Sequence, residues 1–106
     1  MITVSETLLS DAKNYLDITW SDVDTDKKLS GILARGMAFL DRIAGEPQDY
    51  EAEDLARSLL FDYARYARDN ATSDFTAHYL TELNSLSVTS EGERAAALAE
   101  EVGDDG

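Results

Sequence analysis

Three aspartates at alternating positions, Asp22, Asp24 and Asp26, are the residues of this chain that most resemble a metal-binding loop. Carboxylates at alternate positions open the calcium loop of an EF-hand, which also requires a glycine at position six and a glutamate at position twelve. Counted from Asp22, those two positions hold Lys27 and Leu33. The spacing therefore excludes a calcium loop. We expect an acidic loop before a helix, whose positive N-terminal end favours carboxylates.

The other residues with catalytic potential lack partners. His78 is the only histidine, and a general acid or base needs a positioned partner, so we expect an ordinary surface residue. Nucleophile-elbow, phosphate-loop and His-Glu-x-x-His motifs are missing. Glu51, Glu53 and Asp54 would suit a magnesium-dependent helical hydrolase, but such sites need carboxylates from at least two helices. The matching positions of the preceding helix are apolar, so we predict a protein that is not an enzyme, with no cofactor or metal.

Trp20 stands between polar residues in a predicted loop, and two interpretations are open. Its ring is buried in the core, or it contacts a neighbouring subunit, because tryptophan, tyrosine and arginine concentrate at the centres of interfaces.

Phe61 has an arginine one helical turn away on each side, Arg57 and Arg65. In an acidic chain this aromatic and basic surface is suited to an acidic surface on another copy. The alternative is pairing within the chain, with acidic residues near these arginines. Those acidic residues are Glu53, Asp54 and Asp69. The predicted interface consists of Trp20, Arg57, Phe61, Arg65 and Arg68, and we expect Phe61→Ser to impair assembly more than folding.

The elements that position these residues are predicted to be helices. The first begins at Thr3, where Thr3-x-x-Glu6 has the form of a capping box, and ends near Leu16. The second is capped by Asp24 or Thr25. The second helix gives the strongest periodic signal, with apolar residues on one face for four turns. These residues are Leu29, Ile32, Leu33, Gly36, Met37, Leu40, Ile43 and Ala44.

Two glycines of this region have predicted roles. Gly36 lies on the apolar face, where we expect close approach of a neighbouring backbone. Gly45 is placed to adopt the left-handed conformation that ends the helix, and Pro47 prevents its continuation.

The third helix is expected from about Glu51 to Asn70, and it is apolar or aromatic on more than one side. It is therefore either central to the bundle or covered by another chain. The fourth helix runs from about residues 72–74 to Leu86. We predict an all-α fold, a small bundle of four main helices in one domain, residues 1–88. An acidic C-terminal tail, residues 89–106, contains a possible short fifth helix and is otherwise expected to be disordered.

Composition narrows the class of function. The chain has 106 residues, no cysteine and a net charge of −13. Such a surface repels nucleic acid, whose binding depends on lysine and arginine. The charge fits solubility, a basic protein partner, or a surface that avoids adhering to DNA. No apolar run approaches the roughly 20 residues that cross a bilayer, and the acidic N-terminal region predicts no signal peptide.

Four segments, "YLDITW", "TDKKLSGILARGMAFLDRIAG", "ARSLLFDYARYARDN" and "FTAHYLTELNSL", occur in an order that resembles a known family. The family is that of the small head–tail connector proteins of long-tailed phages and prophages of Gram-positive bacteria. The resemblance spans roughly Thr3 to Leu86, and the segment order and the Arg/Tyr-rich third helix carry most of it. The tail after Ser90 lies outside it.

The resemblance implies a helical structural protein of the virion neck, which assembles in the host cytoplasm. Its members form a ring, commonly twelve-fold to match the portal, between the portal protein and the next connector or tail component. The purified chain is monomeric if the ring forms only on the portal. DNA passes through the channel without sequence recognition. The family has no motif that assigns individual binding residues.

Two functions from other classes remain as alternatives. The net charge of −13 also suits an acidic helical inhibitor or DNA mimic that binds a basic host protein. The metal-dependent helical hydrolase described above is the other alternative.

Overall fold

The computed structural model describes residues 4–88, and all regular structure in this range is helical. This confirms the predicted all-α class. Residues 80–88 form a further helical segment after a turn at Tyr79. The predicted fifth helix and the acidic tail lie outside the described residues. The labelled helices are α1 (Glu6–Tyr15), α2 (Val23–Ala44), α3 (Leu55–Arg68) and α4 (Thr72–His78).

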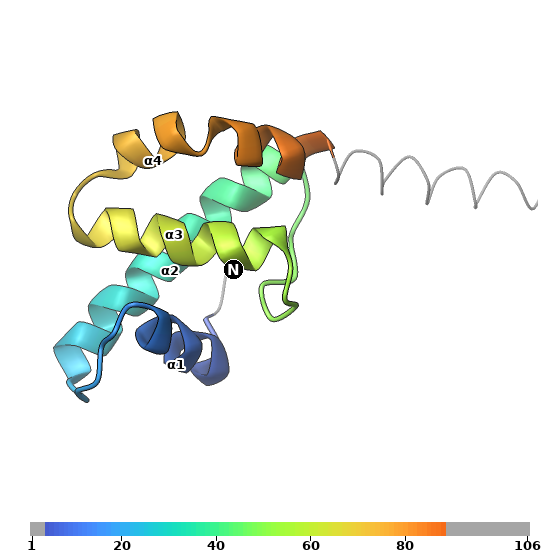
Figure 1. The fold of residues 1–106 in the computed structure, drawn as a ribbon. Coiled ribbons are helices and arrows are strands. Elements are labelled where there is room, and N and C mark those ends of the chain that lie inside the picture. Colours follow the sequence, from blue (N-terminus) through green and yellow to red (C-terminus); the bar gives the residue numbers. More distant parts are fainter. Residues whose placement is uncertain (1–3, 89–106) are drawn as a thin grey trace, which may run out of the picture.

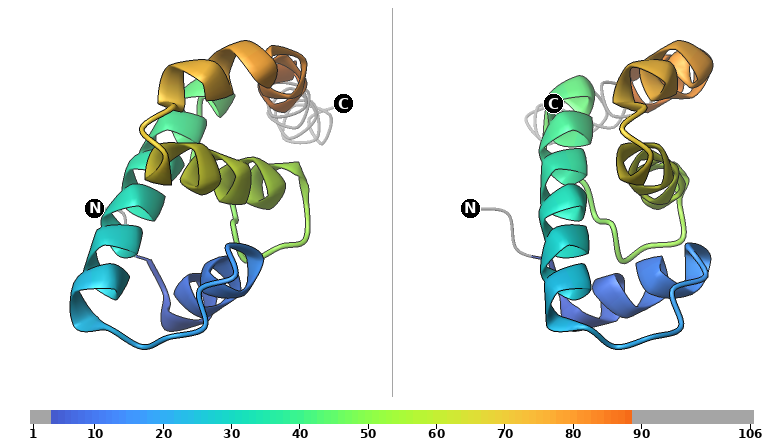
Figure 2. Two further views of the ribbon diagram at one scale, coloured as in Figure 1. Left: turned by 60° about the vertical axis from the view of Figure 1, so that its left-hand side comes forward. Right: turned by 90° about the vertical axis from the view of Figure 1, so that its left-hand side faces the viewer.

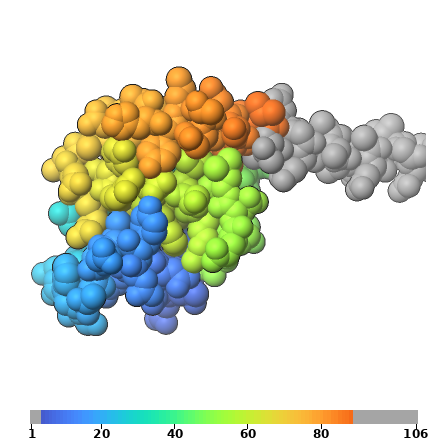
Figure 3. Space-filling model, in the orientation of Figure 1, coloured from blue at the N-terminus to red at the C-terminus, as the bar shows by residue number. Residues whose placement is uncertain are grey.

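Helix α3 is the central element of the bundle. It crosses the long helix α2 on one side and runs antiparallel to α4 and residues 80–88 on the other (Figure 1). Helix α1 packs near the N-terminal end of α2, at the opposite end of the molecule from residues 80–88 (Figure 2). In the space-filling view, α1, α3 and α4 form one continuous face (Figure 3). Of the two interpretations of the third helix, the central position is therefore correct.

The starts of three helices differ from the predicted ones. The Oγ of Ser5 accepts a hydrogen bond from the Leu8 N–H at 3.1 Å and caps α1, so the helix begins after Thr3. The carboxylate of Asp22, rather than Asp24 or Thr25, caps α2. Helix α3 starts at Leu55 behind the cap Asp54, and residues 51–54 form turns. Several neighbouring polar residues compete for each cap, and only the three-dimensional path of the chain selects one.

Helices α1 and α3 end in the same backbone motif. Asp17 and Asn70 adopt left-handed conformations, with φ angles of 60° and 55°. After α1, the Ile18 N–H donates to the Lys13 carbonyl at 2.9 Å, and after α3 the Ala71 N–H donates to the Tyr66 carbonyl at 2.9 Å. These bonds are typical of Schellman motifs.

The predicted end of α2 is confirmed, because Gly45 is left-handed with φ 83°. On the buried face of α2, Gly36 makes room for side chains of α3. A Cβ atom there would lie 2.7 Å from Tyr63 Cδ1 and 2.8 Å from Leu60 Cδ1. Side chains, rather than the predicted neighbouring backbone, therefore explain this glycine.

The predicted fourth helix is broken at Tyr79. This residue has φ −111° and ψ 19° and follows the last residue of α4. Its ring stacks on the fully buried Phe75 with centroids 4.7 Å apart, and its hydroxyl accepts a hydrogen bond from Arg65 at 3.1 Å. The break therefore occurs where the ring and the hydroxyl of one side chain both contact neighbouring aromatic or basic groups.

Candidate functional site

Trp20 lies in the loop between α1 and α2. The left-handed Asp17 turns the chain out of α1, and the next residue, Ile18, enters the core with only 5% of its surface exposed. Two residues later, Trp20 keeps 49% of its surface exposed. Trp20 is therefore not a core residue, and the first of the two interpretations is wrong.

A groove of about 220 Å³ opens on one side of Trp20. We call it the Trp20 groove. Its apolar floor consists of residues that are 2–5% exposed: Ile18, Leu29 and Ile32. Lys28 from α2 and Arg68 from the end of α3 bring positive charge to its rim. Its seven lining residues are Ile18, Trp20, Thr25, Lys28, Leu29, Ile32 and Arg68.

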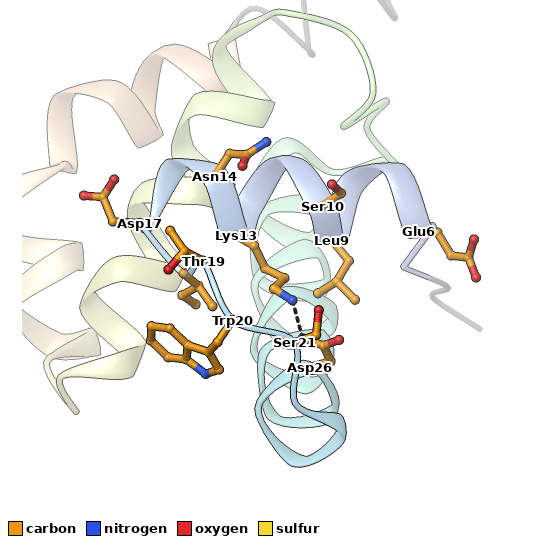
Figure 4. Close-up of a pocket in the computed structure, with 11 residues that line it drawn as sticks. Glu6, Leu9, Ser10, Lys13, Asn14, Asp17, Thr19, Trp20, Ser21 and Asp26 are labelled. Atoms are coloured by element: carbon orange, nitrogen blue, oxygen red, sulfur yellow. Dashed lines mark ion pairs between the residues drawn. The ribbon is translucent and has the colours of Figure 1, made fainter.

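A wider hollow of about 720 Å³ lies on the α1 side of Trp20 (Figure 4). Across it, Lys13 Nζ forms an ion pair with Asp26 Oδ1 at 2.8 Å. Figure 4 shows the indole ring of Trp20 pointing away from this pair. The lysine of this hollow is neutralised within the chain, whereas the Trp20 groove has two basic residues on its rim. The groove is therefore the better candidate for binding an acidic partner.

The acidic residues before α2 have local roles. The Thr25 hydroxyl and backbone N–H both donate to the Asp22 carboxylate, at 2.8 and 3.1 Å. These hydrogen bonds, that of the hydroxyl first, lower the pKa of Asp22 below its ordinary value. Asp24 and Asp26 lie in the first turn of α2. The predicted position at a helix N-terminus is confirmed, but only Asp22 precedes the helix, because Asp24 and Asp26 belong to it.

Phe61 is placed differently from the prediction. Its ring is only 8% exposed and packs against Tyr15 of α1, with centroids 5.6 Å apart. The Arg57 guanidinium lies 4.9 Å from the Phe61 ring centroid and pairs with Asp11 at 2.6 Å. Contacts within the chain therefore account for Phe61 and Arg57, although the pairing acid comes from α1. Burial also changes the expectation for Phe61→Ser, because loss of a buried ring destabilises folding by about 3–5 kcal/mol.

Arg65 belongs to a cluster that joins α1, α3 and the turn after α4. Its guanidinium donates to the Tyr79 hydroxyl at 3.1 Å and lies 3.8 Å from Asp62, rather than pairing with Asp69. The Tyr15 hydroxyl donates to the Asp62 carboxylate. That hydrogen bond, with partial burial and the nearby negative charge, raises the pKa of Tyr15 to about 12. The cluster is a structural link between helices.

The five predicted interface residues thus fall into two groups. Trp20 and Arg68 line the Trp20 groove, whereas Arg57, Phe61 and Arg65 lie along α3, where they contact α1 and the turn after α4. Lys28 completes the groove and was missed, because nothing distinguishes it in sequence from the adjacent Lys27. Only the packing of α2 against the end of α3 brings it near Arg68.

Other kinds of site find no support in the part of the chain that the structure describes. Residues 4–88 contain no group of three or more potential metal ligands. None of their helices has the length and hydropathy to span a membrane. His78 is exposed, and its Nδ1 lies 3.1 Å from the Tyr66 hydroxyl.

Comparisons with known proteins found no matching family model, no similar curated protein and no similar solved structure.

Proposed function

We propose that this chain is a structural assembly protein, a head–tail connector that forms a ring between the portal protein and the next connector or tail component of a long-tailed phage. The observation that carries the proposal is the half-exposed Trp20 beside two basic residues. A large aromatic ring at the surface is a frequent anchor of protein interfaces. The order of the four sequence segments supplies the identity of the assembly.

In this role the chain acts by binding and positioning. The bundle holds the loop that carries Trp20 at one end of the molecule, with α3 packed against α1, α2 and α4 (Figure 1). The net charge of −13 suits a ring whose channel conducts DNA without retaining it. The protein would act in the virion neck after assembly in the host cytoplasm.

Localisation in the particle tests the proposal. Deletion of the gene should yield DNA-filled heads without tails, and electron microscopy of complete virions should place this chain in the neck. Its presence in the tail tip, or normal tailed particles after deletion, would refute the proposal.

A substitution tests the observation that carries it. Trp20→Ala should reduce the yield of tailed particles at least tenfold. Leu80→Ala is the matched control, because Leu80 is another exposed large apolar residue, 57% exposed, outside the groove. The melting transition of the purified variants must be measured, so that a loss of assembly is separated from a loss of folding.

The strongly acidic composition also favours a second function, an inhibitor or DNA mimic that binds a basic host protein. A salt-sensitive complex with a purified nuclease or nucleic-acid-binding protein, together with absence from virions, would replace the connector proposal. Presence in the neck without such a complex would exclude mimicry.

A further inference from the structure

The Trp20 groove combines an apolar floor with a basic rim. The floor residues are almost completely buried by their own chain, so an occupant would contact only their outer atoms and the face of Trp20. The volume of about 220 Å³ exceeds the roughly 150 Å³ of an engineered cavity that holds benzene. The groove is therefore large enough for an aliphatic side chain, with polar groups of the same occupant at the rim.

The basic rim favours an acidic occupant. Among residues 4–88, Lys28 and Arg68 have no carboxylate within ion-pair distance, and both line the same apolar groove. The chain has 22 acidic and nine basic residues, but the seven residues that line the groove include two basic residues and no acidic one. The sign of the charge is therefore reversed locally. Charge complementarity at a rim increases the association rate and the selectivity of binding.

The chain itself contains a segment that combines acidic and apolar residues. Residues 89–106 include six acidic residues and one basic residue. Apolar residues occur between the acidic ones, in "RAAALAEEV". Such a sequence can present Leu98 or Val102 to the floor of the groove and Glu100 and Glu101 to its rim. We propose that the Trp20 groove binds the acidic C-terminal segment, residues 89–106, of a second copy of this chain.

A second copy is favoured over the same chain by the position of the groove. The loop that carries Trp20 and the last described residues lie at opposite ends of the molecule in all views (Figures 1 and 2). Eighteen residues span at most about 60 Å when fully extended. To reach its own groove, the segment would have to return along the length of the molecule, whereas the groove of a neighbouring copy can lie beside the end from which the segment starts.

The contact has a consequence for assembly. Because the groove and the segment are different surfaces, each copy can bind one neighbour with its groove and another with its segment. Such a heterologous contact produces a ring when the rotation between copies closes. The inference therefore deepens the proposed function and takes its biological setting from it, although the contact itself can be tested with the isolated protein.

Paramagnetic labelling tests the contact in the full chain. The sequence has no cysteine and one tryptophan, so Gly106→Cys accepts a single nitroxide outside the proposed contact residues, and Trp20 gives a single indole N–H signal. An isotope-labelled copy without nitroxide is mixed with an unlabelled copy that carries it. At about millimolar concentration, which neighbours in an assembly experience, we expect selective broadening of the Trp20 indole and Lys28 amide signals. No broadening of these signals, or equal broadening over the whole surface, would overturn the proposal.

Charge reversal provides the matched controls. Lys28→Glu with Arg68→Glu in the isotope-labelled copy should weaken the contact about tenfold or more. Lys27→Glu with Arg35→Glu changes the net charge equally outside the groove and should leave the broadening in place. Equal loss of broadening in the two double variants would mean that the contact depends only on net charge, and would refute specific binding in the groove.

Restoration by the complementary change is the decisive measurement. Glu100→Lys with Glu101→Lys in the nitroxide-labelled copy should restore the contact with the Lys28→Glu, Arg68→Glu copy. Failure to restore it, with both proteins folded by their amide spectra, would contradict the proposed pairing. If the contact fails but the chain is found in the neck, the connector function stands without it. If the contact forms but the chain is absent from virions, the connector function fails alone.

Discussion

At the scale of single residues, two residues with left-handed backbone conformations lie next to chain segments that line the Trp20 groove. Asp17 turns the chain between α1 and the loop, so that Ile18 enters the core while Trp20 remains half-exposed. Asn70 ends α3 directly after the turn in which Arg68 lies. Aspartate and asparagine tolerate this conformation better than most residues with side chains. The exposure of Trp20 is therefore a consequence of how α1 ends.

Gly36 and Gly31 provide a matched pair of substitutions on α2. Gly36→Ala gains about 1 kcal/mol of helix propensity, but its Cβ would lie 2.7 Å from Tyr63 and 2.8 Å from Leu60. The Tyr63 ring is held between Phe39 and Phe75 and cannot move freely. We therefore expect a net loss of about 1–3 kcal/mol in the free energy of unfolding, measured by urea denaturation.

Gly31→Ala is the control. Its Cβ would meet only the mobile end of Arg35, at 3.4 Å. We expect this variant to be more stable by about 0.5–1 kcal/mol. If both substitutions stabilised the protein equally, the close packing of α2 on α3 at Gly36 would be wrong.

Tyr15 makes the stability of the protein sensitive to alkaline pH. Its folded-state pKa of about 12 exceeds the value of about 10 for an unfolded tyrosine. The stabilisation is therefore complete below pH 10 and is lost as the pH rises toward 12. In an ultraviolet titration, Tyr15→Phe should remove one late-titrating phenol, and its loss of stability between pH 10 and 12 should be smaller than that of the wild type.

Asp62→Asn is the complementary variant, because it removes the charged acceptor of the Tyr15 hydroxyl. It should bring the pKa of Tyr15 nearer to the ordinary value. A late-titrating phenol that persists in Tyr15→Phe, or an unchanged titration curve in Asp62→Asn, would contradict the hydrogen bond between α1 and α3.

At the scale of elements, the segment between α2 and α3 is fastened by one buried tyrosine. Tyr50 is 3% exposed, and its hydroxyl donates to Asp41 at 2.6 Å, with the Met37 carbonyl 3.1 Å away. Tyr50→Phe should lower the free energy of unfolding by about 1–2 kcal/mol, because a hydrogen bond to a charged group is lost. Thermal denaturation monitored by circular dichroism measures this loss.

Tyr66→Phe is the control for this prediction. Within residues 4–88, the hydrogen-bond partner of the Tyr66 hydroxyl is the exposed His78 ring, at 3.1 Å, and the loss should stay below about 0.5 kcal/mol. Equal losses in the two variants would mean that the Tyr50 hydroxyl does not fasten the segment.

The body of α2 was predictable, whereas the helix ends were not. The apolar face from Leu29 to Ala44 follows from spacing within one helix, and its residues are buried or partly buried as expected. The caps Ser5 and Asp22 were missed because each has polar neighbours that suit the position equally well. The break at Tyr79 occurs where its hydroxyl contacts Arg65 of α3. The spacing of residues in the sequence does not reveal such a contact.

Some residues of the candidate site were also predictable from the sequence, and others were not. Trp20 was identified by its residue type and its position in a predicted loop. The structure places it in the loop between α1 and α2, with about half of its surface exposed. Phe61 was assigned to the surface because its neighbours in sequence are basic, but Tyr15, 46 residues away, covers its ring. Lys28 joins Trp20 and Arg68 only through tertiary packing. Contacts between distant residues, rather than local pattern, therefore decide which predicted residues can meet a partner.

At the scale of the whole molecule, repulsion between like charges is expected to exceed attraction between opposite ones. The chain carries a net charge of −13. The attraction between opposite charges is weak by comparison, because the ion pairs of Lys13, Arg57 and Arg65 are only partly buried or exposed. Surface ion pairs contribute little to stability, whereas a large net charge destabilises a compact chain.

The melting temperature should therefore rise with salt. At 0.1 M ionic strength charges are screened beyond about 10 Å, and relief of about 1 kcal/mol of repulsion would raise the melting temperature by roughly 4–8 °C. Sodium chloride and potassium chloride should act equally, because screening does not depend on which monovalent cation supplies it. A melting temperature that falls as salt increases would mean that the ion pairs of Lys13 with Asp26 and of Arg57 with Asp11 outweigh the net charge. A rise with only one of the two salts would indicate a bound ion instead of screening.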